Sequence, residues 1–172
     1  QVLDGEDLHT SIQSMIRFVI DGIVHAAFGE QKHLGDLSQF AEMMRHIEGV
    51  YLPEGSWKVT EDELKALTKE QAEEKLMQLM DSFYAAKEQQ YTPEVERVIT
   101  LRVVDEYWMD HIDAMDDLRQ GIRLRAYAQE DPVIAYKREG FEMFEALTSA
   151  IKEEIVRRLF SFRLKTDAEV KR

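Results

Sequence analysis

One stretch of the chain concentrates side chains that could bind a metal ion. It contains aspartates and a single histidine at short spacing, namely Asp105, Asp110, His111, Asp113, Asp116 and Asp117. Carboxylate oxygens and imidazole nitrogens are common ligands of zinc and calcium. A metal-dependent enzyme built on Asp110, His111 and Asp113 is therefore one hypothesis. Titration with calcium, zinc or manganese would test it, because a ligand of the native state must raise the melting temperature.

The same residues fit a plainer interpretation. On a helix, Asp110, Asp113 and Asp117 share one face, which would be the solvated face opposite an apolar stripe. His111 would then lie beside that stripe. The HExxH pattern of zinc enzymes does not occur in the sequence. We therefore favour a solvated helix face over a metal site.

Other motifs of catalysis are absent from the sequence. There is no GxxxxGK[ST] loop to hold nucleotide phosphates, and neither GxGxxG nor GxSxG occurs. The lack of cysteine excludes a thiol nucleophile and a thiolate zinc site. His9, His25, His33 and His46 have no second ligand at close spacing. We therefore expect no catalytic residue, no cofactor and no metal ion in this chain.

The composition narrows the class of partner. The formal net charge of −12 over 172 residues argues against nucleic acid, because phosphate binding needs clustered Lys and Arg. It also argues against broad docking on anionic lipid. No run approaches the roughly 18 apolar residues that cross a bilayer, and the first residues do not resemble a signal peptide. The lack of cysteine fits a reducing compartment, so we expect a soluble, cytosolic chain.

The first half of the sequence has the apolar spacing of helices. Residues 7–28 form one amphipathic stretch with Gly29 as its stop, and residues 37–47 form a shorter one. Two further helices should begin at capping boxes, in which a threonine and a Glu or Gln three residues later satisfy free amides. These boxes are Thr60–Glu63 and Thr68–Gln71. The pattern predicts a small helical domain over residues 1–92.

Two longer helices follow, and a proline marks the start of each. Thr92-Pro93 and Asp131-Pro132 both place a capping side chain before a proline at the first helical position. The predicted helices cover residues 93–124 and 132–162, and the first should be about 48 Å long. Because their connection is short, they should fold back on each other as an antiparallel pair.

The predicted contact between these two helices is apolar. The stripe of the first helix consists of Leu101, Val104, Trp108, Ile112, Met115 and Leu118. That of the second consists of Val133, Tyr136, Gly140, Phe144, Leu147, Ile151, Ile155, Leu159 and Phe162. Gly140 would allow a close backbone approach opposite Trp108 or Met115. The fold class is therefore all-α, with a small helical domain, a two-helix hairpin over residues 93–165 and a frayed tail over residues 166–172.

The loop of the hairpin carries side chains suited to binding. Arg123, Arg125, Tyr127 and Gln129 should surround its tip. Tyrosine offers an apolar ring, a hydroxyl group and little rotamer entropy, which suits loose contact with many partners. In the alternative, Tyr127 folds back and covers the end of the hairpin. The residues alone do not decide between these two interpretations.

A longer stretch around this loop resembles a known family. Residues 108–132 carry the sequence LRxYAQxDP after a WxxH helix, and residues 136–144 continue the likeness. Together they resemble the helical scaffold of SecA, the ATPase of bacterial preprotein translocation, over about residues 93–162. Residues 1–92 are similar to the helical wing of that family, with the end of the preceding scaffold helix, in helical content, acidity and position.

The resemblance implies a role in protein transport. The helices 93–124 and 132–162 would be the two-helix finger of SecA, with Tyr127 at a tip that contacts unfolded preprotein and the SecYEG channel. Arg123 and Arg125 match basic positions of the family's finger loop. The first long helix would pack on the nucleotide-binding domains of the parent chain and relay their state.

The resemblance also implies where the parent acts and what it binds. ATP, magnesium and the zinc of a C-terminal tail would belong to parts of the parent outside this chain. The parent would be cytoplasmic and peripheral at the inner face of the bacterial cell membrane. A second hypothesis, from the residues, is a non-catalytic helical adaptor that binds partner helices through methionine-rich faces and moves no substrate.

Overall fold

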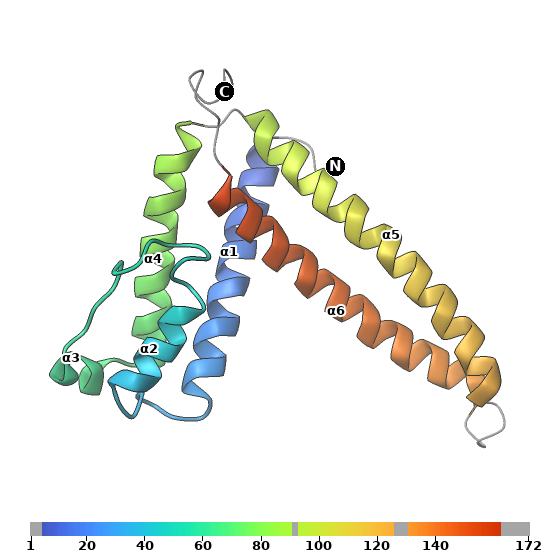
Figure 1. Ribbon diagram of the computed structural model, residues 1–172, viewed down its shortest axis with the longest axis horizontal. Helices are drawn as coiled ribbons and strands as arrows, with labels where there is room; N and C mark the ends of the chain where they lie inside the picture. The colour runs from blue at the N-terminus through green and yellow to red at the C-terminus, as the bar shows by residue number, and fades with distance from the viewer. Residues whose placement is uncertain (1–4, 91–92, 126–130, 163–172) are drawn as a thin grey trace, which may run out of the picture.

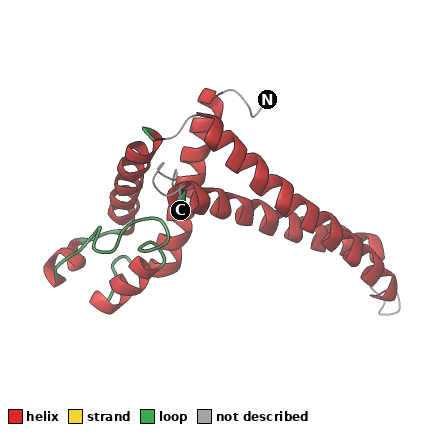
Figure 2. Cartoon of the chain, turned by 45° about the horizontal axis from the view of Figure 1, so that its top comes forward, coloured by secondary structure: helices red, strands yellow, loops and turns green. Residues whose placement is uncertain are grey.

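The computed structural model describes residues 5–90, 93–125 and 131–162, and within them the chain consists of helices and connecting loops. The helices are α1 (Gly5–Phe28), α2 (Leu37–Arg45), α3 (Glu61–Ala66), α4 (Lys69–Glu88), α5 (Pro93–Arg125) and α6 (Pro132–Ser161). The predicted all-α class is confirmed (Figure 2). None of the described helices combines the length and the apolar character that crossing a membrane requires.

The ends of the helices follow the local sequence. Both predicted capping boxes are present, from Thr60 to Glu63 at α3 and from Thr68 to Gln71 at α4. Gly29 has a φ of 55°, the left-handed conformation that lets the chain leave α1 at little cost.

The two long helices begin where the prolines predict. Pro93 is the first residue of α5, and Pro132 is the first residue of α6. The side chain of Asp131 accepts a hydrogen bond of 2.9 Å from the backbone N–H of Val133 and so caps α6. Thr92, the predicted cap of α5, lies outside the described residues.

Helix α1 forms the centre of the core. It lies between α4 and α6 (Figure 1) and also packs against α2 and α5. Ile12, Ile16 and Ile20 of α1 are almost completely buried. Each side chain of this kind contributes about 1.5–3 kcal/mol when it leaves water. The core also takes in Leu76 of α4 and Leu159 of α6, so it continues across residue 92, the predicted boundary between two domains. That division stays a prediction.

Helices α5 and α6 form an antiparallel pair that projects away from α1, α2 and α4 and converges toward its connecting loop (Figure 1). A Cβ atom added to Gly140 would lie 3.2 Å from the Cε atom of Met115. Met115 therefore occupies the close approach at Gly140, whereas the side chain of Trp108 is 46% exposed.

The predicted contact stripe of α5 is wrong for most of its length. Its members Leu101, Val104 and Ile112 are exposed, while Val103 and Ile122 are buried. Because α5 has apolar residues on more than one face, it buries a face that is rotated from the predicted one. The stripe of α6 is buried only near its C-terminal end, where α6 enters the core, and it is exposed at Val133 and Phe144.

Candidate functional site: the distal hairpin and its base

The distal end of the hairpin, as far as the structure describes it, consists of the last turns of α5 and the first turns of α6 on either side of the loop (Figure 1). Of the residues predicted at the tip, Arg123 is exposed and Arg125 is the last residue of α5. Tyr127 and Gln129 lie outside the described residues. The structure therefore places the helix ends that hold the predicted tip.

Exposed apolar side chains flank this loop. Leu124 is 74% exposed, and Val133 and Ile134 are each 60% exposed. Within two residues of them in the sequence, Ile122 is 5% exposed and Ala135 is completely buried. The two helices are thus packed together close to the loop, and apolar side chains face solvent around the same end. Sequence reasoning missed Leu124 and Ile134, although apolar residues next to a polar loop were a visible signal.

An aromatic cluster bridges the middle of the hairpin. The ring of His111 lies 5.4 Å from that of Trp108 and 6.1 Å from that of Phe144 on α6, measured between centroids. His111 therefore packs between two aromatic rings, while Trp108 and Phe144 each remain about half exposed. Among the residues predicted to hold the hairpin together, Trp108 and Phe144 form this open cluster, and Met115 and Gly140 make the close inner contact.

The aspartates of α5 lie on the outside of the hairpin. Asp110 and Asp113 are exposed, and Asp116 accepts a hydrogen bond of 2.7 Å from Arg119. Within the part of the chain that the structure describes, the atoms close enough together to share one metal ion belong to His9, Glu88 and Glu96. They do not belong to the aspartate set. The geometry of α5 thus matches the solvated helix face.

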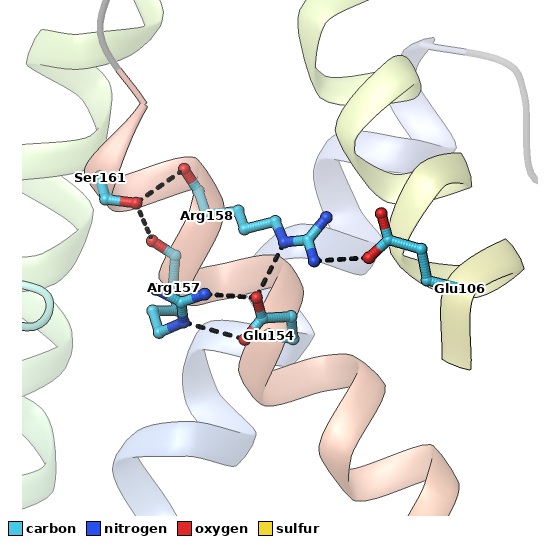
Figure 3. Close-up of polar contacts among 5 residues, drawn as sticks. All are labelled: Glu106, Glu154, Arg157, Arg158 and Ser161. Carbon is cyan, nitrogen blue, oxygen red and sulfur yellow. Dashed lines mark hydrogen bonds and ion pairs between the residues drawn. The ribbon is translucent and has the colours of Figure 1, made fainter. Parts of the chain in front are cut away.

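An ion-pair network joins α5 to α6 nearer the core (Figure 3). The Arg158 side chain donates to Glu106 on α5 at 2.6 Å and to Glu154 on α6 at 2.8 Å. Arg157 donates to the same Glu154 carboxylate at 2.5 Å. Planar guanidinium groups that share a carboxylate hold it in a fixed orientation. We call Glu106, Glu154, Arg157 and Arg158 the junction network.

The network shifts the pKa values of its members. The hydrogen bond from Arg158 lowers the pKa of the Glu106 carboxyl. The bond from Arg157, followed by that from Arg158, lowers the pKa of Glu154 below its ordinary value of 4.5. The bonds to Glu106 and Glu154 in turn raise the pKa of Arg158. All four side chains are therefore charged at neutral pH.

The end of α6 is anchored in the core. Phe160 stacks on Tyr84 of α4, with ring centroids 5.3 Å apart, and on Phe83 at 5.9 Å. The Lys87 ammonium group donates to the backbone carbonyls of Phe160 and Phe162. A cation at the C-terminal end of a helix satisfies carbonyl groups that have no partner inside that helix. The base of the hairpin is thus bonded to α4 as well as packed on α1.

Comparison with known proteins identifies the family. Residues 1–163 match the family model described as the SecA wing and scaffold domain. The chain belongs to the SecA family. The predicted resemblance is confirmed, and it extends over residues 1–92, which the sequence had tied to the family mainly by position.

Curated relatives of the chain bear the name of a protein translocase subunit. The SecA subunit of Clostridium novyi is 42% identical over 100% of this chain and 21% of its own length. SecA 1 of Clostridioides difficile is 44% identical over 99% of the chain and 19% of its own length. SecA of Clostridium perfringens is 44% identical over 98% of the chain and 20% of its own length. The chain thus spans about a fifth of these SecA relatives and corresponds to the wing and scaffold region.

Acid should loosen the junction network of this SecA region. A carboxyl whose pKa is lowered by folding contributes stability above its ordinary value of 4.5, and this contribution is lost as the pH falls through the folded value. The melting temperature should therefore drop below about pH 4.5. Glu154→Gln should cost about 1 kcal/mol at pH 7 and reduce that drop. Glu145→Gln, on the exposed side of α6, is the control. If the melting temperature of both variants depended on pH as that of the parent does, the junction network would not be the source of the acid sensitivity.

Proposed function

We propose that this chain is the wing and two-helix finger of a SecA motor, and that the finger carries motion to a translocating preprotein. The observation that supports this most directly is the hairpin itself. It stays packed as far as Ile122 and Ala135, close to the distal ends of α5 and α6, which lie far from α1, α2 and α4 (Figure 1). The distal ends of α5 and α6 would therefore move together as one unit.

The contacts at the base suit the transmission of a displacement. Arg158 links α5 to α6, and Lys87 links the end of α6 to α4. Close-packed interiors resist compression, so a displacement of the helices in the core would be transmitted to the distal ends of α5 and α6 almost undiminished. The finger would therefore convert a rotation of the scaffold into movement of its loop.

The exposed apolar side chains suggest two contact areas. Leu124, Val133 and Ile134 surround the loop, where they would hold unfolded preprotein segments through weak apolar contacts near the mouth of the SecYEG channel. Leu101 and Ile112 lie along α5, where we place the nucleotide-binding domains of the parent chain. ATP and magnesium would be bound there, and zinc in a C-terminal tail. This region would supply no catalytic residue, and the parent would act in the cytoplasm, peripheral to the cell membrane.

Site-specific photo-crosslinking tests the proposed function. A photoreactive amino acid at Leu124 or Ile134 of the full-length motor should form adducts with a preprotein stalled during translocation. The same amino acid at Gln78, an exposed position on α4, is the control because it lies on the wing side of the core. Equal yields at all three positions would remove the distal hairpin from the path of the preprotein.

The exposed stripe of α5 also supports a second candidate, a helical adaptor that holds one partner and moves no substrate. A methionine-rich binding face is a poorer basis for it, because Met43, Met44 and Met80 are buried in the core. A stable partner bound along Trp108 and Ile112, without any adduct from the loop, would favour the adaptor.

A further inference from the structure

We propose that His9, Glu88 and Glu96 form a binding site for one divalent transition-metal ion, with zinc as the ion that fits best. The three side chains come from α1, α4 and α5, at the place where α4 connects to α5. One ligand atom of each lies within 4.8 Å of the others. This site is independent of the proposed function of the hairpin.

The donor set suits zinc. One imidazole nitrogen and two carboxylate oxygens are ligands that Zn²⁺ accepts at about 2.1 Å, which separates them from one another by about 3.4 Å. The Nδ1 atom of His9 already lies 2.9 Å from a carboxylate oxygen of Glu88. Carboxylate oxygens of Glu88 and Glu96 lie within 4.8 Å of each other. Both His9 and Glu88 are partly exposed, so they can move inward by the small distance that remains.

Neighbouring side chains orient the ligands as they do around known metal ions. The Tyr84 hydroxyl donates a hydrogen bond of 2.5 Å to Glu96, which is only 7% exposed. The Gln13 amide lies 3.3 Å from the Nε2 atom of His9. When Nδ1 binds a metal, Nε2 carries the proton, and the amide oxygen of Gln13 accepts it after a half-turn of the amide group.

A buried hydroxyl group provides a second, independent observation. Thr100 lies one helical turn after Glu96 on the buried face of α5, and in a helix the Cα–Cβ bond tilts toward the preceding turn. Its hydroxyl is buried without a hydrogen-bond partner among the described residues. Such a group is rare in a native protein and often marks a water molecule or an ion. Three protein ligands leave one position of a tetrahedral zinc ion open, and a water molecule there would give Thr100 a partner.

The charge of the site also favours a cation. Two carboxylates within 4.8 Å of each other repel each other unless a cation lies between them, and the repulsion is strongest for a group as buried as Glu96. A divalent ion neutralises both. It would also bond α1, α4 and α5 to one another and so stiffen the base of the hairpin.

Zinc titration of the 172-residue chain, after treatment with a chelator, tests the site. Calorimetry should give a stoichiometry of about one ion per chain, and the melting temperature should rise by on the order of 5 °C when zinc is about 100 times Kd. Glu88→Gln and His9→Ala should each weaken zinc binding at least about tenfold. The measure is the response to zinc, so a change in the stability of the metal-free variants does not affect it.

Two controls address other histidines. His111→Ala and His46→Ala should bind zinc as the parent chain does, because both residues lie outside the cluster. The absence of any rise in melting temperature would overturn the proposal. The proposal would also be overturned if Glu88→Gln bound zinc as tightly as the parent chain while His111→Ala or His46→Ala lost zinc binding. Neither result would alter the crosslinking expected at Leu124.

Discussion

Replacing Ala135 with glutamate should unpair the distal end of the hairpin and stop protein transport by the full-length motor. Ala135 is completely buried beside α5, only four residues after the end of the loop. A carboxylate placed there without a partner costs roughly 3 kcal/mol or is expelled into solvent. The nearby turns of α6 contribute little to the core, so expulsion by local unfolding is the easier course.

Amide hydrogen exchange and a translocation assay measure this effect together. Exchange should accelerate in residues 132–145 while the core around Ile16 and Leu159 keeps its protection. Transport should fall to background although nucleotide binding by the parent is unchanged. Ala146→Glu is the matched control, because Ala146 is an exposed alanine on the same helix. If both variants gave the same exchange and transport, the distal packing would have no part in the motor.

The sequence predicted the helix ends well because local chemistry determines them. Asp131 caps α6 through its own side chain, and Thr60 and Thr68 complete capping boxes within three residues. Gly29 ends α1 because it adopts a φ that other residues avoid. Each of these signals is contained in a few neighbouring residues, so no knowledge of the tertiary structure was needed.

The buried face of α5 could not be predicted in the same way. Leu101 and Val104 have the spacing of a contact stripe, yet Val103 and Ile122 are the residues that become buried. A helix with apolar residues on two faces gives no periodic signal that distinguishes them, and the partner helix decides. The exposed stripe is then free to meet another part of the protein, which is consistent with a chain that spans about a fifth of its relatives.

The metal-ligand cluster was also beyond the reach of the sequence. His9 had no second ligand at close spacing, because its companions lie on α4 and α5 and only the tertiary fold brings them together. The aspartates of α5 have the short sequence spacing of a metal site, but among the described residues their oxygens are not grouped closely enough with other ligand atoms to share one ion. Spacing along one helix shows which side chains share a face, whereas a site built from three helices depends on how those helices pack.

Replacing Tyr127 with alanine or glycine in the full-length motor should impair translocation far more than nucleotide binding. Tyr127 lies outside the described residues, but the helix ends on both sides of it are fixed by Ile122 and Ala135. Ring contacts worth about 1 kcal/mol each would hold varied preprotein segments and release them again, as a repeated stroke requires. The loss of one such contact should slow transport at least about fivefold.

Tyr127→Trp distinguishes a ring contact from a structural role of the tyrosine. Tryptophan retains an aromatic ring with a polar group, so this variant should preserve most of the transport rate if the ring makes the contact. If the tyrosine hydroxyl were what the loop needs, the variant would lose transport as Tyr127→Ala does. Unchanged translocation in Tyr127→Ala would show that the loop residue does not hold the preprotein. In that case the exposed side chains beside the loop, Leu124 and Ile134, would have to provide the contact. Their combined replacement by serine would then produce the loss that the tyrosine did not.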